Sequence, residues 1–127
     1  LHHHRELRLY GRSYGTHHAA RTYGDPMPCG RRGKVNGNPI RMSEMLATLD
    51  GPSYIARCSL ADVPNIKKAK KAILQAFKNQ MEGKGFSFVE LLSTCPTNWH
   101  MSPVKALDFV KNEMTAQYPL GVFKEVE

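Results

Sequence analysis

The chain has 127 residues, of which 41% are hydrophobic and 23% charged, as expected of one packed domain. It contains no run of 18 apolar residues and opens with no signal region, which argues against a membrane span and against secretion. Three cysteines are too few for a disulfide scaffold, so we predict a reducing, cytoplasmic location and no membrane partner. The formal charge of +7 would by itself favour an anionic partner.

The positive charge is concentrated in the first 40 residues, where seven Lys or Arg face two acidic residues, a balance of +5. The same stretch holds five of the six histidines and few long aliphatic residues. Such a composition buries too little apolar surface to offset its chain entropy. We therefore place a boundary near Asn38–Pro39, with an irregular segment over 1–37 and an α/β region over 38–127.

The α/β region opens with a predicted helix and a predicted strand. The apolar face of the helix repeats at i, i+3, i+4 and i+7 and is made by Met42, Met45, Leu46 and Leu49. Asp50-Gly51-Pro52 ends it. In the strand predicted over 53–60, alternate residues share one face, which places Cys58 inward as a small core residue.

A long helix follows, starting at Asp62 and Pro64. Its predicted inward stripe is Ile66, Ala69, Ile73, Ala76, Phe77 and Met81. Five lysines cover much of the remaining surface: Lys67, Lys68, Lys70, Lys71 and Lys78. They could grip phosphate, but such a run is more often the solvated face of an amphipathic helix, which is the interpretation we favour.

Residues 86–92 form a nearly unbroken apolar run, typical of a strand covered on both faces in a parallel sheet. Ser102-Pro103 begins a last helix with Leu107, Val110 and Met114 inward, and residues 118–121 end it. Strand, helix, strand predicts a right-handed βαβ unit with flanking helices. Two strands are too few for a self-sufficient sheet, so either others lie in the first 40 residues or part of a larger domain is missing.

Several candidate sites have a plainer explanation. Residues 30–34 are basic but lack interleaved aromatic residues, which weakens a nucleic-acid interpretation. The histidines at 2–4 and 17–18 could bind a transition metal, although no fixed geometry is evident. Cys29 has no partner at a metal-ligand spacing, and the chain has no Walker loop, catalytic triad motif or paired-cysteine zinc motif.

Cys95 stands out because it follows the carboxyl end of the predicted 86–92 strand, in Thr94-Cys95-Pro96-Thr97-Asn98-Trp99. In open α/β sheets, ligands bind at that edge. A thiolate there could be a metal-cluster ligand or a nucleophile, and an idle loop thiol is an equally good explanation of the spacing.

The α/β region resembles a known family over residues 36–124. The similar segments occur in the right order at the right spacing, at residues 38–42, 46–55, 67–73, 85–99 and 118–124. They resemble the carboxyl-terminal part of the β subunit of 2-oxoacid:ferredoxin oxidoreductases, particularly the 2-oxoglutarate and 2-ketoisovalerate members.

The resemblance implies the carboxyl-terminal part of a thiamine-diphosphate-binding domain. The family decarboxylates a 2-oxo acid on thiamine diphosphate with Mg²⁺, passes electrons through [4Fe–4S] clusters to ferredoxin and transfers the acyl group to coenzyme A. A cysteine matching Cys95 is the distant fourth ligand of one cluster. The other three cysteines and the diphosphate–magnesium motif belong to the amino-terminal half, so the resemblance implies no catalytic residue and no bound cofactor on this chain alone.

Residues 1–27 do not match the family. Codon degeneracy permits a one-base shift that restores the family motif, including Ala-Pro-Thr-Thr-Leu from Gly15 through Ala20. Our hypothesis is that this stretch is an out-of-frame translation, which sequencing the gene would test.

Three interpretations therefore stand. The first is a fragment of the oxidoreductase β subunit, partnered by the other subunits, ferredoxin and coenzyme A. The second is a small basic nucleic-acid-binding module, which salt-sensitive binding would favour. The third is a non-catalytic assembly piece that occupies a partner surface of the full complex.

Overall fold

The computed structural model describes residues 40–99 and 101–126. Its elements in chain order are α4 (Met42–Ala47), β1 (Pro52–Ser59), α5 (Val63–Met81), β2 (Phe86–Leu92), α6 (Pro96–Trp99), α7 (Pro103–Phe109), the π-helical turn η1 (Val110–Met114), α8 (Thr115–Gln117) and β3 (Gly121–Glu125). The predicted boundary near Asn38–Pro39, the histidines at 2–4 and 17–18, Cys29 and residues 30–34 lie outside the described residues.

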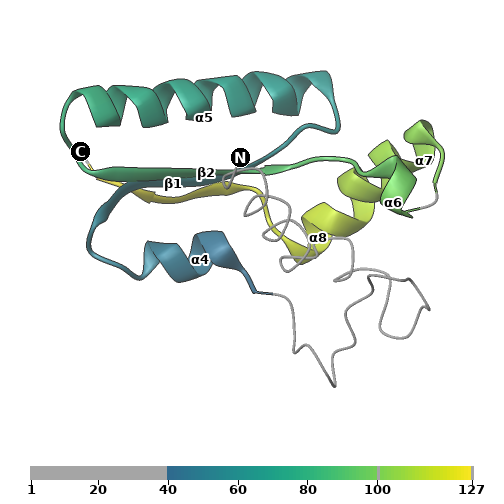
Figure 1. The fold of residues 1–127 in the computed structure, drawn as a ribbon, viewed down its shortest axis with the longest axis horizontal. Helices are drawn as coiled ribbons and strands as arrows, with labels where there is room; N and C mark the ends of the chain where they lie inside the picture. Colours follow the sequence, from purple (N-terminus) through teal and green to yellow (C-terminus); the bar gives the residue numbers. More distant parts are fainter. Residues whose placement is uncertain (1–39, 100, 127) are drawn as a thin grey trace, which may run out of the picture. The chain divides into compact units, whose positions relative to one another are not determined.

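The described strands form one sheet in the order β2-β1-β3. β1 pairs in parallel with β2 and α5 lies between them in the chain, so the predicted strand–helix–strand unit with parallel strands is confirmed. β3 pairs antiparallel with β1, from Tyr54↔Glu125 to Arg57↔Gly121. The expectation of a parallel sheet is therefore wrong for this strand, and the α/β sheet is mixed. In Figure 1, α5 lies over one face of the sheet and α4 under the other, while α6, α7 and α8 gather beyond one end of the strands.

The central strand is β1, and all eight of its residues are buried. We expected β2 to be covered on both faces, which is wrong within the described part of the chain. β2 lies at the edge of the sheet, and Phe86 and Leu91 are exposed there. The apolar run identified the strand correctly, but it could not show which strand has neighbours on both sides.

The helix α5 begins as predicted, because the Asp62 carboxylate accepts a hydrogen bond from the Asn65 backbone N–H at 2.9 Å. The predicted inward stripe is wrong in its second half. Phe77 and Met81 are 66% and 86% exposed, and the fully buried positions of the helix are Ala69, Ala72 and Asn79. Small side chains allow α5 to lie close to β1, and the larger apolar side chains point away from it.

The helix α4 is also turned differently from the expectation. Ser43 is its buried residue, and Met45 and Leu49 are exposed. In the last helical stretch, Val110 and Met114 are buried as predicted, whereas Leu107 is exposed and Ala106 lies inward instead. Among the described residues, no helix combines the length and apolarity needed to cross a membrane.

Candidate functional site

The Cys95 loop occupies the edge of the sheet at which the two parallel strands end. β1 ends at Ser59 and β2 at Leu92, and these two residues are register partners. The Leu60 N–H then donates to the Leu92 carbonyl at 2.9 Å, which continues the pairing past both strand ends. Cys95 follows three residues later as an exposed free thiol. Its predicted position beyond the carboxyl end of the strand is confirmed.

A buried aromatic pair anchors this loop on its far side. The Trp99 backbone N–H donates to the Cys95 carbonyl at 3.0 Å, and this hydrogen bond spans the short helix α6 that follows Cys95. The Trp99 ring is buried and meets Phe109 of α7 edge-to-face, with ring centroids 5.0 Å apart. Such a pair contributes about 1 kcal/mol beyond its buried area. The backbone of Cys95 is therefore tied to the core while its side chain remains accessible.

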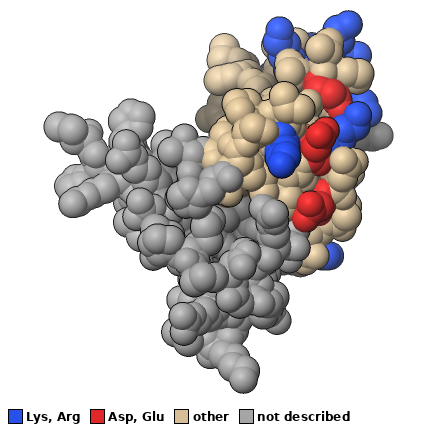
Figure 2. Space-filling model, turned by 90° about the vertical axis from the view of Figure 1, so that its right-hand side faces the viewer, with Lys and Arg blue, Asp and Glu red and all other residues tan. Residues whose placement is uncertain are grey.

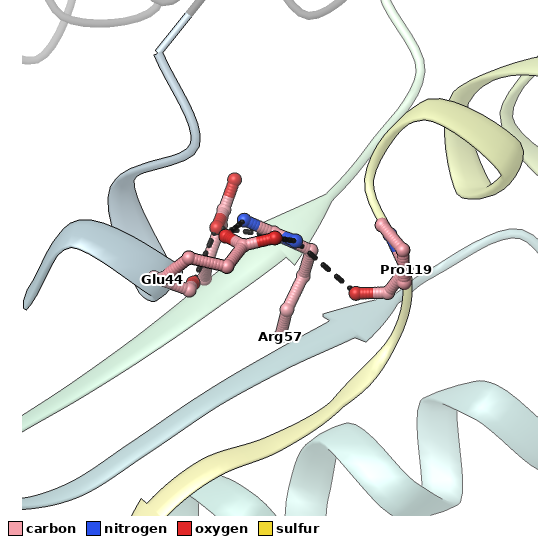
Figure 3. A network of polar contacts seen from close by, with 5 residues as sticks. Glu44, Arg57 and Pro119 are labelled. Atoms are coloured by element: carbon pink, nitrogen blue, oxygen red, sulfur yellow. Dashed lines mark hydrogen bonds and ion pairs between the residues drawn. The ribbon is translucent and has the colours of Figure 1, made fainter. Parts of the chain in front are cut away.

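A buried arginine network stands behind the same edge, on the α4 face of the sheet. Arg57 of β1 is 1% exposed and is the register partner of Glu90 on β2. Its Nε donates to Glu90 Oε2 at 2.7 Å, and its Nη1 and Nη2 donate to Glu44 Oε1 and Oε2 at 2.9 Å and 2.5 Å. Figure 3 shows the guanidinium reaching between Glu44 and Pro119. This paired geometry toward Glu44 is the one that best suits an arginine–carboxylate contact.

The network also fixes the turn that leads into β3. Arg57 Nη1 donates to the Pro119 carbonyl at 3.1 Å, and the guanidinium lies over the rings of Tyr118 and Phe123, at 5.3 and 5.0 Å from their centroids. The Ser43 hydroxyl donates to Glu90 Oε2 at 2.6 Å from α4. One side chain thus joins α4, β1, β2 and the turn before β3.

Hydrogen bonds determine the electrostatics of this network. The hydrogen bond from Arg57 holds the pKa of Glu44 below its usual value, against the opposing effect of burial. Burial alone would lower the pKa of Arg57, but its hydrogen bonds to Glu44 and Glu90 outweigh burial and raise it. Both shifts favour the ion pair between Arg57 and Glu44. Glu90 Oε1 is buried and has no hydrogen-bond partner among the described residues.

Arg57 was not predicted from the sequence. A charged residue in an alternating strand usually faces solvent, so Arg57 alone gives no signal. Glu90 is the anomaly, because a charged residue within the apolar run of β2 needs a buried partner. The partner Glu44 could not have been found this way, because it depends on how α4 is rotated.

Cys58 and the five lysines of α5, which were also considered from the sequence, take no part in this network. Cys58 is buried on the opposite face of the sheet among Tyr54, Ala56, Ala69 and Ala72, as predicted for a core residue. Burial raises the pKa of its thiol. The five lysines of α5 are all exposed, as expected of a solvated helix face.

The described residues do not fit an iron–sulfur cluster by themselves. A [4Fe–4S] cluster takes four thiolates. The part of the chain that the structure describes offers Cys95 on the surface and Cys58 in the core, and it contains no group of three His, Cys, Asp or Glu able to hold a metal ion. Any cluster at Cys95 therefore needs ligands from outside these residues.

Comparison with curated proteins identifies three relatives. The chain is 43% identical over 98 residues to the ketoisovalerate oxidoreductase subunit VorA of Methanothermobacter marburgensis. It is 42% identical to the VorA subunit of Methanothermobacter thermautotrophicus, also over 98 residues, and 32% identical over 95 residues to the 2-oxoglutarate synthase subunit KorB of the same organism. Its homologues are 2-oxo acid oxidoreductase subunits.

The matches cover most of this chain but only a small part of each relative. They cover 77% of this chain for both VorA proteins and 71% for KorB. The chain spans only about a fifth of each VorA relative and 29% of KorB. No family model and no solved structure matches the chain.

The surface shown in Figure 2 carries both signs of charge. Acidic side chains lie between basic ones on this face, over the described residues. A nucleic-acid interface is usually a continuous basic patch or stripe. The visible charge pattern on this face therefore does not favour the nucleic-acid-binding interpretation.

Proposed function

We propose that this chain is a carboxyl-terminal portion of the β subunit of a 2-oxoacid:ferredoxin oxidoreductase, of the ketoisovalerate or 2-oxoglutarate type. The complete cytoplasmic enzyme decarboxylates a 2-oxo acid to its acyl-coenzyme A and passes the electrons to ferredoxin. The observation that carries the proposal is Cys95, an exposed thiol at the carboxyl edge of two parallel strands, in a chain homologous to such oxidoreductase subunits.

In this proposal the chain contributes one thiolate and a rigid mount for it. Cys95 would be one ligand of a [4Fe–4S] cluster, whose chemistry is one-electron transfer. The hydrogen bond from Trp99 and the Trp99–Phe109 contact hold the loop in place. Thiamine diphosphate and Mg²⁺ would bind to the part of the domain outside the matched segment. The isolated chain would therefore be catalytically inactive.

Two protein forms test the proposal: the 127-residue chain alone, and the chain extended at its amino terminus with the preceding part of a VorA relative. We expect iron and thiamine diphosphate to bind to the extended protein and not to the chain alone. In the extended protein, Cys95→Ser should remove the four-iron cluster seen by its electron paramagnetic resonance signal. The core control Cys58→Ala should keep that cluster.

Two results would contradict the proposal. A full four-iron signal in the Cys95→Ser protein would show that this thiol is not a ligand. Failure of the extended protein to bind thiamine diphosphate, while it remains folded by circular dichroism, would contradict the assignment to a thiamine-diphosphate-binding domain.

A further inference from the structure

A groove runs between α5 and the edge strand β3, on the face of the sheet opposite Arg57's partners Glu44 and Glu90. Among the described residues, the helix α5 packs mainly on β1 and β2, which leaves this face of β3 open beside it. The resulting cavity has a volume of about 440 Å³, within the range of small-molecule sites. It lies apart from Cys95, which is not among its lining residues.

One wall of the groove is a polar row on α5. Asn65, Lys68, Lys71 and Gln75 line the cavity from this helix. Residues three or four apart on a helix project from the same side, so the two ammonium groups are neighbours, flanked by an amide at each end. The ends of the row are ten helical steps apart, about 15 Å at the usual helical rise. The neighbouring lysines Lys67 and Lys70 do not line the cavity.

The floor and the opposite wall are mainly apolar. The buried Tyr54, Ala56, Cys58 and Ala72 form the floor, and Leu120 and Val122 line the β3 side. Glu125 stands at one end, since it is the register partner of Tyr54. The two lysines therefore face an apolar slot with a single acidic residue at its far end.

The groups that line the groove also influence each other's pKa. The positive charge of Lys68 acts on the Cys58 thiol, where it opposes the burial that raises the pKa of that thiol. Burial also raises the pKa of Tyr54, and the charges of Cys58 and Glu125 raise it further. The helix row, the floor and the strand end thus surround one space.

We propose that the groove between α5 and β3 binds a small organic anion, with its phosphate or carboxylate group held between Lys68 and Lys71 and its apolar part over Ala56 and Val122. The paired ammonium groups select a negative charge, and the apolar floor selects a body larger than an inorganic ion. Arg57 also lines the cavity, although its guanidinium binds Glu44 and Glu90 on the opposite face of the sheet. The site is independent of the proposed function because Cys95 is not among its lining residues.

The test is a titration of the isotope-labelled 127-residue chain followed by amide chemical shifts in nuclear magnetic resonance. The probes are phenyl phosphate, phenylacetate, inorganic phosphate and the neutral benzyl alcohol. We expect saturable shifts at residues 65–75 and 121–125 with phenyl phosphate or phenylacetate, whichever head group the site prefers. Inorganic phosphate and benzyl alcohol should bind at least about tenfold more weakly, because the first lacks an apolar part and the second lacks a negative charge.

Two matched double variants locate the charge. The double variant Lys68→Met with Lys71→Met should weaken binding of the preferred anion by about tenfold. The control Lys67→Met with Lys70→Met removes the same charge from the same helix, and it should change the affinity by less than about twofold. Equal weakening by both pairs would overturn the proposal, because it would show attraction to the net charge alone. Absence of saturable shifts with both organic anions, or shifts confined to the exposed Phe77 and Met81 face, would also overturn it.

Discussion

Both faces of β1 are buried, and they are held by different interactions. On the α4 face, Arg57 satisfies two carboxylates and a carbonyl through directed hydrogen bonds. On the α5 face, small side chains such as Ala56 and Ala69 pack without directed bonds. Loss of a single hydrogen-bonding group on the α4 face should therefore lower the stability of the domain. On the α5 face, a larger side chain should lower it.

The comparison also separates the two proposed roles. The α4 face supports the strand ends that precede the Cys95 loop, and the groove opens on the α5 face. A variant that disturbs one face should leave the other intact, provided that the domain remains folded.

The largest effect is expected from Arg57→Met. This change leaves Glu90, and partly Glu44, as buried carboxylates without their counter-charge, which typically costs about 3–5 kcal/mol of unfolding free energy. Urea unfolding followed by circular dichroism measures it. The double variant Arg57→Met with Glu90→Met should be less destabilised than Arg57→Met alone, because the orphaned charge of Glu90 is then removed. A double variant that is less stable than the single one would contradict this account.

The second effect concerns added volume on the α5 face. Ala69→Leu places three extra carbons where α5 meets β1, and overpacking of this kind typically costs about 1–3 kcal/mol. The control Lys70→Leu puts the same side chain at the exposed neighbouring position. We expect it to change the unfolding free energy by about 0.5 kcal/mol or less. If the two leucine variants were equally stable, close packing of α5 would not be what holds this face.

A third, smaller effect tests the start of α5. Asp62→Ala removes the carboxylate that accepts from the Asn65 N–H, and loss of such a cap costs about 1 kcal/mol. The control Asp108→Ala removes an exposed carboxylate from α7 and should be nearly neutral. The same urea titration reports both values, and equal stability of the two variants would argue against the cap.

The smallest effect depends on pH. Arg57 lowers the folded-state pKa of Glu44, so the stability due to this carboxylate is present above its unfolded pKa and is lost as the pH falls through the lower folded value. The unfolding free energy of the wild type should exceed that of Glu44→Gln by less than about 1 kcal/mol at pH 7, because Glu44 is partly exposed. The difference should shrink from about pH 5 downward. A difference that grew toward low pH would reverse the predicted sign.

Much of this fold was predictable from the sequence because its signals are local. The Asp62 cap and the apolar run of β2 depend on nearby residues. The predicted stop at Asp50-Gly51-Pro52 is too late, because α4 ends at Ala47 with Thr48 as its cap and Gly51 is not left-handed. The carboxyl-edge position of Cys95 followed from the parallel βαβ unit, which needed only the order of the elements.

The remainder depends on contacts between distant segments. The strand β3 is short, and its residues Gly121–Glu125 show no strong alternation, so its pairing with β1 left no sequence signal. The predicted rotation of α5 was wrong because a hydrophobic stripe shows which side chains are apolar, but not which of them contact β1. In the same way, Ser43 is buried because it bonds to Glu90, 47 positions along the chain.

The π-helical turn Val110–Met114 has a consequence for everything that follows it. Such a turn accommodates one residue more than an α-helical turn does, and Phe109, Val110 and Met114 are all buried around it. If this turn rewound as an α-helix with all of its residues kept, the extra residue would rotate the following segment by about 100°. Tyr118 would then swing out from beneath the guanidinium, and the strand that closes the sheet would enter it out of phase.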